Sequence, residues 1–213
     1  MTRLRVMPTS PDPYAALYLH EVGEIVRSVD PAAVGELANA LADVRRREGR
    51  LFILGVGGGA AHASHAVNDF RKLCDFEAYA PTDNVAELTA RTNDEGWETS
   101  FDAWLRTSRL SSRDAILVFS VGGGSRKHNV SVNLVRAIEL AQDVGARVFG
   151  VVGRAEGATA EKADVCIVID APPERRTPHV EEFQAIVWHL LVSHPALAKT
   201  SGKWESVEVA GGG

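Results

Sequence analysis

Residues 51–60 read Leu51-Phe-Ile-Leu-Gly-Val-Gly-Gly-Gly-Ala60, an apolar run followed directly by a glycine-rich turn. This pattern predicts a buried strand, a tight turn and the start of a helix. Residues 115–125 repeat it as Ala115-Ile-Leu-Val-Phe-Ser-Val-Gly-Gly-Gly-Ser125. Because backbone N–H groups at the start of a helix bind anions, two such turns indicate a ligand that carries phosphate. Glycine in such turns also serves positive φ angles and close packing, so a purely structural role stays open.

Strands and helices are expected to alternate along most of the chain. The apolar runs are continuous rather than alternating, which is typical of parallel strands covered on both faces. We expect an α/β fold with a five-stranded parallel sheet, in which both glycine turns lie at the carboxyl edge and share a crevice. The expected strands are 50–55, 77–81, 114–120, 147–152 and 165–170. The expected helices are 14–29, 32–48, 60–74, 84–92, 97–110, 129–144, 157–163 and 180–193.

The composition excludes several classes of protein. The 213 residues carry a net charge of −5, so a large nucleic-acid footprint is not expected. The chain shows neither a signal-peptide pattern nor an apolar stretch long enough for a bilayer, so no membrane partner is expected. Cys74 and Cys166 are far apart in the sequence, which argues against a disulfide framework and favours a cytoplasmic location.

Two helices carry residues suited to metal binding or proton transfer. His65 and Asp69 are four residues apart and therefore share a helix face, where they can chelate a divalent metal. Asp69 can instead act as a general base, and the pair can also be an ordinary exposed one. Glu181 and His189 are eight apart on the last helix, so ligands from both helices can form a four-ligand site. Gln184 is expected to be rotated from that face and Trp188 to point elsewhere.

The same motifs, in this order, resemble the sugar isomerase (SIS) domain family, and within it the phosphoheptose isomerases. The resemblance runs from about residue 30 to about residue 195. His65, Asp69, Glu181 and His189 fall where that family has His, Glu, Gln and His. The other matching segments are Gly55-Val-Gly-Gly-Gly59, Thr82-Asp83, Asn93-Asp94-Glu-Gly96 and the loop that begins at Ser120.

The resemblance implies a flavodoxin-like sheet with flanking helices in a homotetramer. It implies an N-terminal tail and helix at 1–30, an SIS domain at 31–200 and a C-terminal tail at 201–213. The implied reaction converts sedoheptulose 7-phosphate to D-glycero-D-manno-heptose 7-phosphate through an enediol, often with Zn²⁺. Asp69 would be the base, His189 the acid or its partner, and His65, Asp69, Glu181 and His189 the metal ligands. The implied substrate-binding residues are Gly57, Gly58, Gly59, Asp83, Asn93, Asp94, Ser120, Gly122, Gly123, Gly124, Ser125 and Ser131.

The chain also departs from the family pattern. Val121 and Gly122 replace two hydroxyl residues of the phosphate loop, and Gly59 replaces a phosphate-binding serine. A short insertion brings in Arg126, Lys127 and His128, whose positive charges are candidates for binding phosphate instead. Three alternatives therefore stay open: an isomerase of a different sugar phosphate, a non-catalytic sugar-phosphate-binding module, and a dinucleotide-binding protein.

Overall fold

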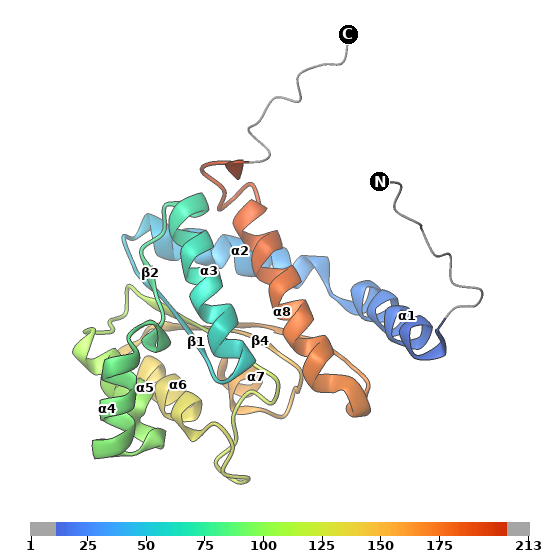
Figure 1. The fold of residues 1–213 in the computed structure, drawn as a ribbon. Helices are drawn as coiled ribbons and strands as arrows, with labels where there is room; N and C mark the ends of the chain where they lie inside the picture. Colours follow the sequence, from blue (N-terminus) through green and yellow to red (C-terminus); the bar gives the residue numbers. More distant parts are fainter. Residues whose placement is uncertain (1–11, 204–213) are drawn as a thin grey trace, which may run out of the picture.

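A five-stranded parallel sheet forms the centre of the computed structural model, which describes residues 12–203 (Figure 1). The strand order is β2-β1-β3-β4-β5, with every neighbouring pair parallel. The α/β fold and all five predicted strands are confirmed, although the second has only two residues. The strands are β1 (Leu51–Gly55), β2 (Ala78–Tyr79), β3 (Ala115–Ser120), β4 (Arg147–Val152) and β5 (Val165–Val168).

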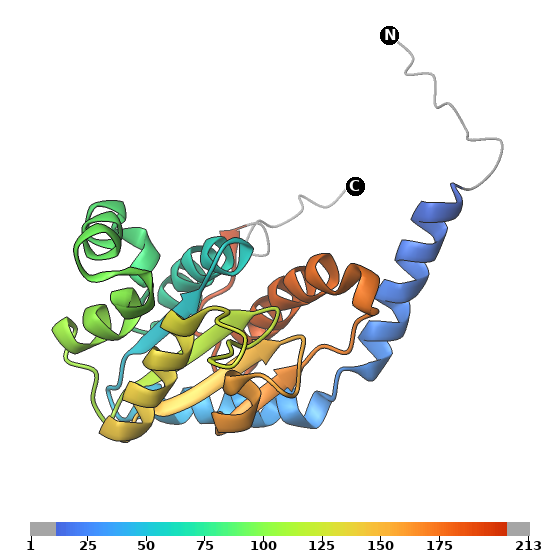
Figure 2. The same ribbon diagram turned by 90° about the horizontal axis from the view of Figure 1, so that it is seen from below.

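Helices cover both faces of the sheet. Strand β1 sends Leu51 and Ile53 into one apolar core and Phe52 and Leu54 into the other. The first core lies under α2 (Pro31–Arg46), α3 (Gly58–Cys74) and α8 (Arg176–Ser193). The second lies under α5 (Ser100–Thr107) and α6 (Val132–Val144), and the two layers are seen in Figure 2. This two-sided burial explains why the strand sequences are apolar without alternation.

Shorter elements complete the chain at the edges of the sheet. Helix α4 (Val85–Glu95) lies against α5, and α7 (Ala158–Lys162) lies against β4 and β5. Three 3₁₀ turns are η1 (Pro81–Asp83), η2 (Trp97–Thr99) and η3 (Pro173–Arg175). None of the helices within residues 12–203 combines the length and apolar character needed to cross a membrane. The predicted tails fall largely on residues 1–11 and 204–213, outside the described part of the chain.

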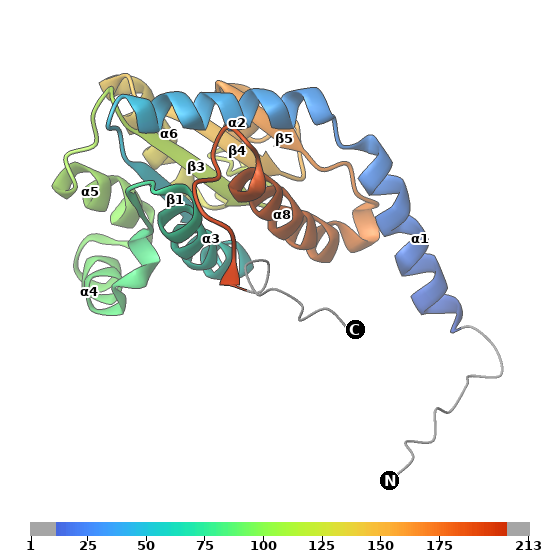
Figure 3. The same cartoon turned by 90° about the horizontal axis from the view of Figure 1, so that it is seen from above.

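Helix α1 (Pro13–Ser28) extends beyond the end of the sheet, as Figure 3 shows. Both N-terminal helices begin with an aspartate followed by proline. The Asp12 side chain accepts a hydrogen bond from the Ala15 backbone N–H at 2.7 Å, and Asp30 accepts one from Ala32 at 2.8 Å. These capping bonds satisfy N–H groups that have no partner within the helix, so each helix begins where the sequence predicts.

Two predicted helix starts were wrong by several residues. Helix α6 begins at Val132 rather than at 129, because an antiparallel bridge joins Ser125 to Val130 and Ser131 has a φ of 46°. Helix α8 begins at Arg176 rather than at 180. Pro178 lies in its first turn, where a missing N–H removes no intrahelical hydrogen bond.

Candidate active site

Helices α3 and α8 run parallel on one face of the sheet and carry the candidate site between them. Each follows the carboxyl end of a strand, so both begin at the same edge of the sheet. The contacts between them occur in the same order along both helices. Glu181 lies against Gly58 near the start, and Gln184 forms a hydrogen bond with His62 about one turn further on. One to two turns further on, His189 lies beside Asp69.

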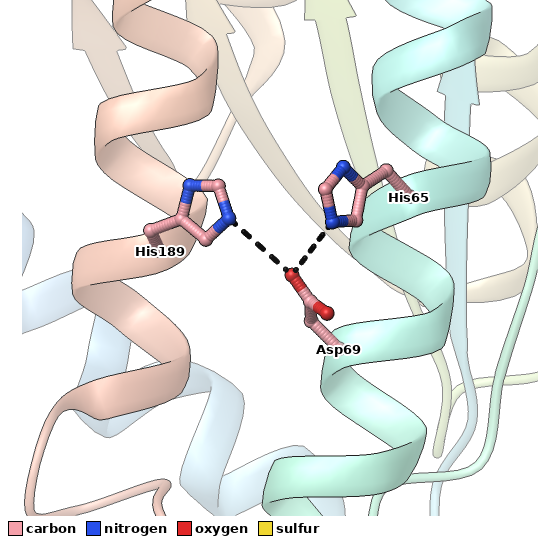
Figure 4. A group of neighbouring side chains, drawn as sticks. All are labelled: His65, Asp69 and His189. Carbon is pink, nitrogen blue, oxygen red and sulfur yellow. Dashed lines mark ion pairs between the residues drawn. The ribbon is translucent and has the colours of Figure 1, made fainter. Parts of the chain in front are cut away.

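Two imidazoles, those of His65 and His189, face one oxygen atom, Asp69 Oδ2. His65 Nε2 lies 3.5 Å from it and His189 Nε2 lies 3.6 Å from it (Figure 4). His65 and Asp69 come from α3 and His189 comes from α8. The side chain of Asp69 is 11% exposed, whereas the side chains of His65 and His189 are 56% and 53% exposed. A buried carboxylate therefore faces two imidazoles that are open to a ligand.

The hydrogen bonds of His189 show which nitrogen is free. Its Nδ1 lies 2.8 Å from the backbone carbonyl oxygen of Ala185. A carbonyl only accepts, so Nδ1 carries the proton and donates it. In the neutral imidazole the lone pair of Nε2 then faces the acceptor Asp69 Oδ2, and a cation or a second proton between them would satisfy both atoms.

Three of the four predicted metal ligands lie together. His65, Asp69 and His189 each place one ligand atom within 4.8 Å of the others. Two imidazole nitrogens and one carboxylate oxygen form a donor set that suits Zn²⁺ and other divalent metals. This donor set and the facing acceptors therefore fit a metal ion. Glu181 lies two helical turns from His189, about 12 Å along α8, so this structure does not place it in the group.

Two residues of α8 that the sequence predicts to point away from α3 lie in the contact between α3 and α8. Trp188 was expected to point elsewhere, but its Nε1–H donates to Asp69 Oδ2 at 3.1 Å. Gln184 was expected to be rotated away, but it is fully buried and its Oε1 lies 3.0 Å from His62 Nδ1. Glu181, Gln184 and Trp188 follow the i, i+3, i+7 spacing of one helix face, and this signal could have identified them.

The two glycine turns meet at the edge of the sheet where the strand order reverses. Gly57, Gly58 and Gly59 follow β1, and the second turn follows β3, the neighbour of β1. A Cβ atom on Gly59 would lie 2.6 Å from the carbonyl oxygen of Phe119, so the first turn packs against the end of β3. Such a switch point is where open α/β sheets bind ligands. The two turns therefore lie at the carboxyl ends of neighbouring strands, and a crevice shared between them stays a prediction.

The second turn is ordered by its own hydrogen bonds. Ser120 Oγ accepts from the Gly123 N–H at 3.0 Å, and Gly123 and Gly124 adopt φ angles of 73° and 81° that favour glycine. Gly122 has open space around its Cβ position. Ser125 Oγ accepts from the backbone of His128, which ties the insertion to the turn.

The remaining predicted residues lie in separate surroundings. Asp83, in η1, accepts a hydrogen bond from Ser64 on α3. Asn93 and Asp94 are exposed on α4, where Asn93 Nδ2 donates to Asp94 Oδ1 at 2.7 Å. Neither of them belongs to the group around Asp69.

The inserted positive charges lie beside Gly124 and Ser125 of the second turn. Arg126 pairs with Glu139 on α6, with an Nε to Oε1 distance of 3.0 Å. Together with Lys127 and His128 it lines a cavity of about 470 Å³ beside α6 and α7. In this structure Arg126 is therefore held by a carboxylate on α6.

Several known proteins are similar to this chain in sequence or in fold, although no protein-family model matches it. It is 34% identical over 188 residues to the lincomycin biosynthesis protein LmbN of Streptomyces lincolnensis, over 83% of this chain and 66% of that protein. It is 33% identical over 165 residues to a phosphoheptose isomerase of Geotalea daltonii, over 75% of this chain and 79% of that protein. The solved structure of a phosphoheptose isomerase from Neisseria gonorrhoeae superimposes with a TM-score of 0.74 at 22% identity, over 84% of this chain and 96% of that one.

The strand order, the paired glycine turns and this superposition define a protein of the sugar isomerase (SIS) fold. The sequence match then identifies the family. The chain belongs to the phosphoheptose isomerase family.

Proposed function

We propose that the protein is an aldose–ketose isomerase that converts sedoheptulose 7-phosphate to D-glycero-D-manno-heptose 7-phosphate. The observation that carries the proposal is the convergence of two imidazoles on the buried carboxylate oxygen of Asp69. A base and an acid placed within a few ångströms of each other are what proton transfer between neighbouring carbons requires. The relatives named phosphoheptose isomerase support this choice of reaction.

The proposed mechanism moves one proton between carbons and one between oxygens. Asp69 takes the proton from C1 of the ketose while His189 gives a proton to the oxygen on C2, which forms the enediol. His189 then takes the proton from the oxygen on C1 as Asp69 returns its proton to C2. The product is the aldose, and both side chains end in their starting states.

A divalent ion, which we propose to be Zn²⁺, would be held by His65 and Asp69, and by His189 whenever its Nε2 carries no proton. When bound, it would polarise the substrate carbonyl and stabilise the developing negative charge. Glu181, the fourth ligand that the resemblance implies, lies beside Gly58 and about 12 Å along α8 from His189, too far to share the ion. The half-exposed imidazoles leave room for the substrate on the solvent side.

The phosphate is proposed to bind at the glycine turns. Backbone N–H groups of Gly57, Gly58 and Gly59 would contribute, with Ser120, Gly122, Gly123, Gly124, Ser125 and Ser131 from the second loop. Asp83, Asn93 and Asp94 are the proposed partners of substrate hydroxyl groups. The carboxylate of Glu181 lies close to the first turn, since a Cβ atom on Gly58 would be 2.6 Å from it. Its negative charge would repel an anion bound there. The second turn is therefore the better phosphate site.

An isomerase of a different sugar phosphate is the second candidate. The loop after β3 favours it, because Val121 and Gly122 carry no hydroxyl group and the insertion leads away to α6. A non-catalytic sugar-phosphate-binding module would need neither Asp69 nor His189 as reacting groups. We further propose a cytoplasmic homotetramer, in keeping with the two free cysteines and the apolar side chains exposed on α1 and α8.

The test is an NMR assay of the purified protein with sedoheptulose 7-phosphate, with added Zn²⁺ and with chelator. Formation of an aldoheptose 7-phosphate is expected, and Asp69→Asn and His189→Ala should each lower kcat by at least about 10³-fold. His20→Ala, on the exposed part of α1, is the matched control and should keep full activity. No conversion by the folded protein in any metal condition would contradict the proposal, and a screen of other sugar phosphates would separate the second candidate from a binding module.

A further inference from the structure

Trp188 contacts the proposed reacting groups, and the mechanism leaves it without a role. Its indole is 2% exposed, and its Nε1–H donates to Asp69 Oδ2 at 3.1 Å. The ring centroid lies 5.3 Å from that of His65 and 4.8 Å from that of His189. Trp188 therefore touches all three members of the group while remaining closed to solvent.

The carboxylate of Asp69 is held from two sides. Asn68 Nδ2 donates to Oδ1 at 2.9 Å, and the Trp188 indole donates to Oδ2. Two donors on two oxygens fix both the position and the rotation of the carboxylate plane. Oδ2 then faces His65 and His189 at nearly equal distances of 3.5 and 3.6 Å.

The indole also limits the length of the acidic side chain. It packs between His62, 5.1 Å away, and Phe119 of β3, 5.9 Å away, measured between ring centroids, so it has no room to retreat. An additional methylene at position 69 would drive the carboxylate into the indole or past the imidazoles. A buried core of this density accommodates added atoms only by shifting side chains from their preferred rotamers.

We propose that Trp188 is a positioning residue that matches this site to an aspartate at position 69. Its N–H holds Oδ2 at the two imidazoles, and its ring occupies the volume that a glutamate would need. Trp188 itself does not touch the reacting carbons. The kinetic part of the proposal rests on the proposed function, whereas the hydrogen bond does not.

The hydrogen bond is tested first by NMR of the indole N–H groups, without substrate or metal. The chain has four tryptophans, and Trp188→Phe identifies the resonance of Trp188. Should that variant not fold, Phe substitutions of Trp97, Trp104 and Trp204 identify it by elimination. Asp69→Asn should shift the Trp188 resonance upfield and speed its exchange with water. An unchanged Trp188 resonance would overturn the proposal whatever reaction the protein catalyses.

A double-mutant cycle tests the matching of the two residues. Trp188→Phe should lower kcat about tenfold and Asp69→Glu about 100-fold, both with little change in KM, because misplacement of about 1 Å costs rate rather than binding. The double variant should lose far less than the product of the two, with a coupling of about tenfold or more. Trp104→Phe, on the other face of the sheet, is the matched control.

The two outcomes of the cycle are distinct. A simple product of the two losses, or an Asp69→Glu variant as active as the natural chain, would overturn the matching of residues 69 and 188. If no sugar phosphate is converted at all, the proposed function fails, and the same cycle is read from the affinity of each of the four proteins for Co²⁺, measured by calorimetry. Additive affinities, or no binding by any of the four proteins, would then overturn the matching as well.

Discussion

At the scale of single residues, the site depends on one carboxylate oxygen. Asp69 Oδ2 accepts from the Trp188 indole and faces Nε2 of His65 and Nε2 of His189. The Ala185 carbonyl fixes the tautomer of His189, so its Nε2 is available to a ligand or a proton. A buried acceptor surrounded in this way is costly unless a cation or proton completes it. The same arrangement therefore suits metal binding and proton transfer.

Gly59 and Gly122 offer a prediction about the missing serines of the phosphate turns. A Cβ on Gly59 would lie 2.6 Å from the carbonyl oxygen of Phe119, and that backbone is part of a central strand. Gly59→Ser should therefore lower the free energy of unfolding by about 1–3 kcal/mol. Gly122→Ser should be tolerated, because nothing lies within 4 Å of its Cβ position. Urea unfolding of both variants checks this, and equal losses would contradict it.

The spacing of residues within a helix predicted the neighbours on each helix but not the packing between helices. His65 and Asp69 lie together because four residues make about one turn. The sequence predicts that Trp188 points away from the site, because neighbours on a helix such as Trp188 and His189 point about 100° apart. Its true partner, Asp69, lies on α3, and only the side-by-side packing of α3 and α8 shows this.

At the scale of elements, the sequence predicted the strands and the glycine turns because each depends on the residues of its own segment. Strands β1 and β3 are apolar throughout since helices cover both faces, and the turns after them need glycine. The loop from 121 to 131 was less readable. Its positive φ angle at Ser131 occurs at a residue type that carries no such signal. Helix α6 therefore begins later than its apolar pattern indicates.

The attachment of α1 to the start of α8 gives a prediction about pH. Glu21 accepts from Arg175 Nε at 2.7 Å and lies 2.9 Å from His179 Nε2. These hydrogen bonds lower the pKa of Glu21 from 4.5 to about 2. A lowered pKa means that the stabilisation is present in full above about pH 5 and is lost as the pH falls toward 2. Glu21→Gln should therefore reduce stability at pH 7 and have little effect near pH 2.

Urea unfolding of the natural chain and Glu21→Gln at several pH values between 7 and 2 measures this difference. Glu24→Gln is the matched control, because Glu24 forms an exposed ion pair with Arg27 on the same helix. Exposed pairs of this kind contribute little to stability, so the control should show no such pH dependence. A loss for Glu21→Gln that stays constant over this range would show that the carboxylate does not act through its charge.

At the scale of the whole molecule, exposed apolar side chains gather beside the site. Val26 of α1 and Ile186 and Leu190 of α8 are exposed and line a cavity of about 390 Å³ with Val29 and Val34. Apolar surface of this kind on a folded chain marks a contact with another protein.

Replacing this apolar surface by charge tests the proposed homotetramer. Ile186→Lys combined with Leu190→Lys should convert the assembly to smaller species, because burying two unpaired ammonium groups in an interface costs several kcal/mol. Sedimentation equilibrium measures the mass of each protein, and Val85→Lys, an exposed apolar position on α4, should leave it unchanged. A natural chain that sediments as a monomer would contradict the homotetramer. A tetramer that survives the double substitution would place the interface elsewhere.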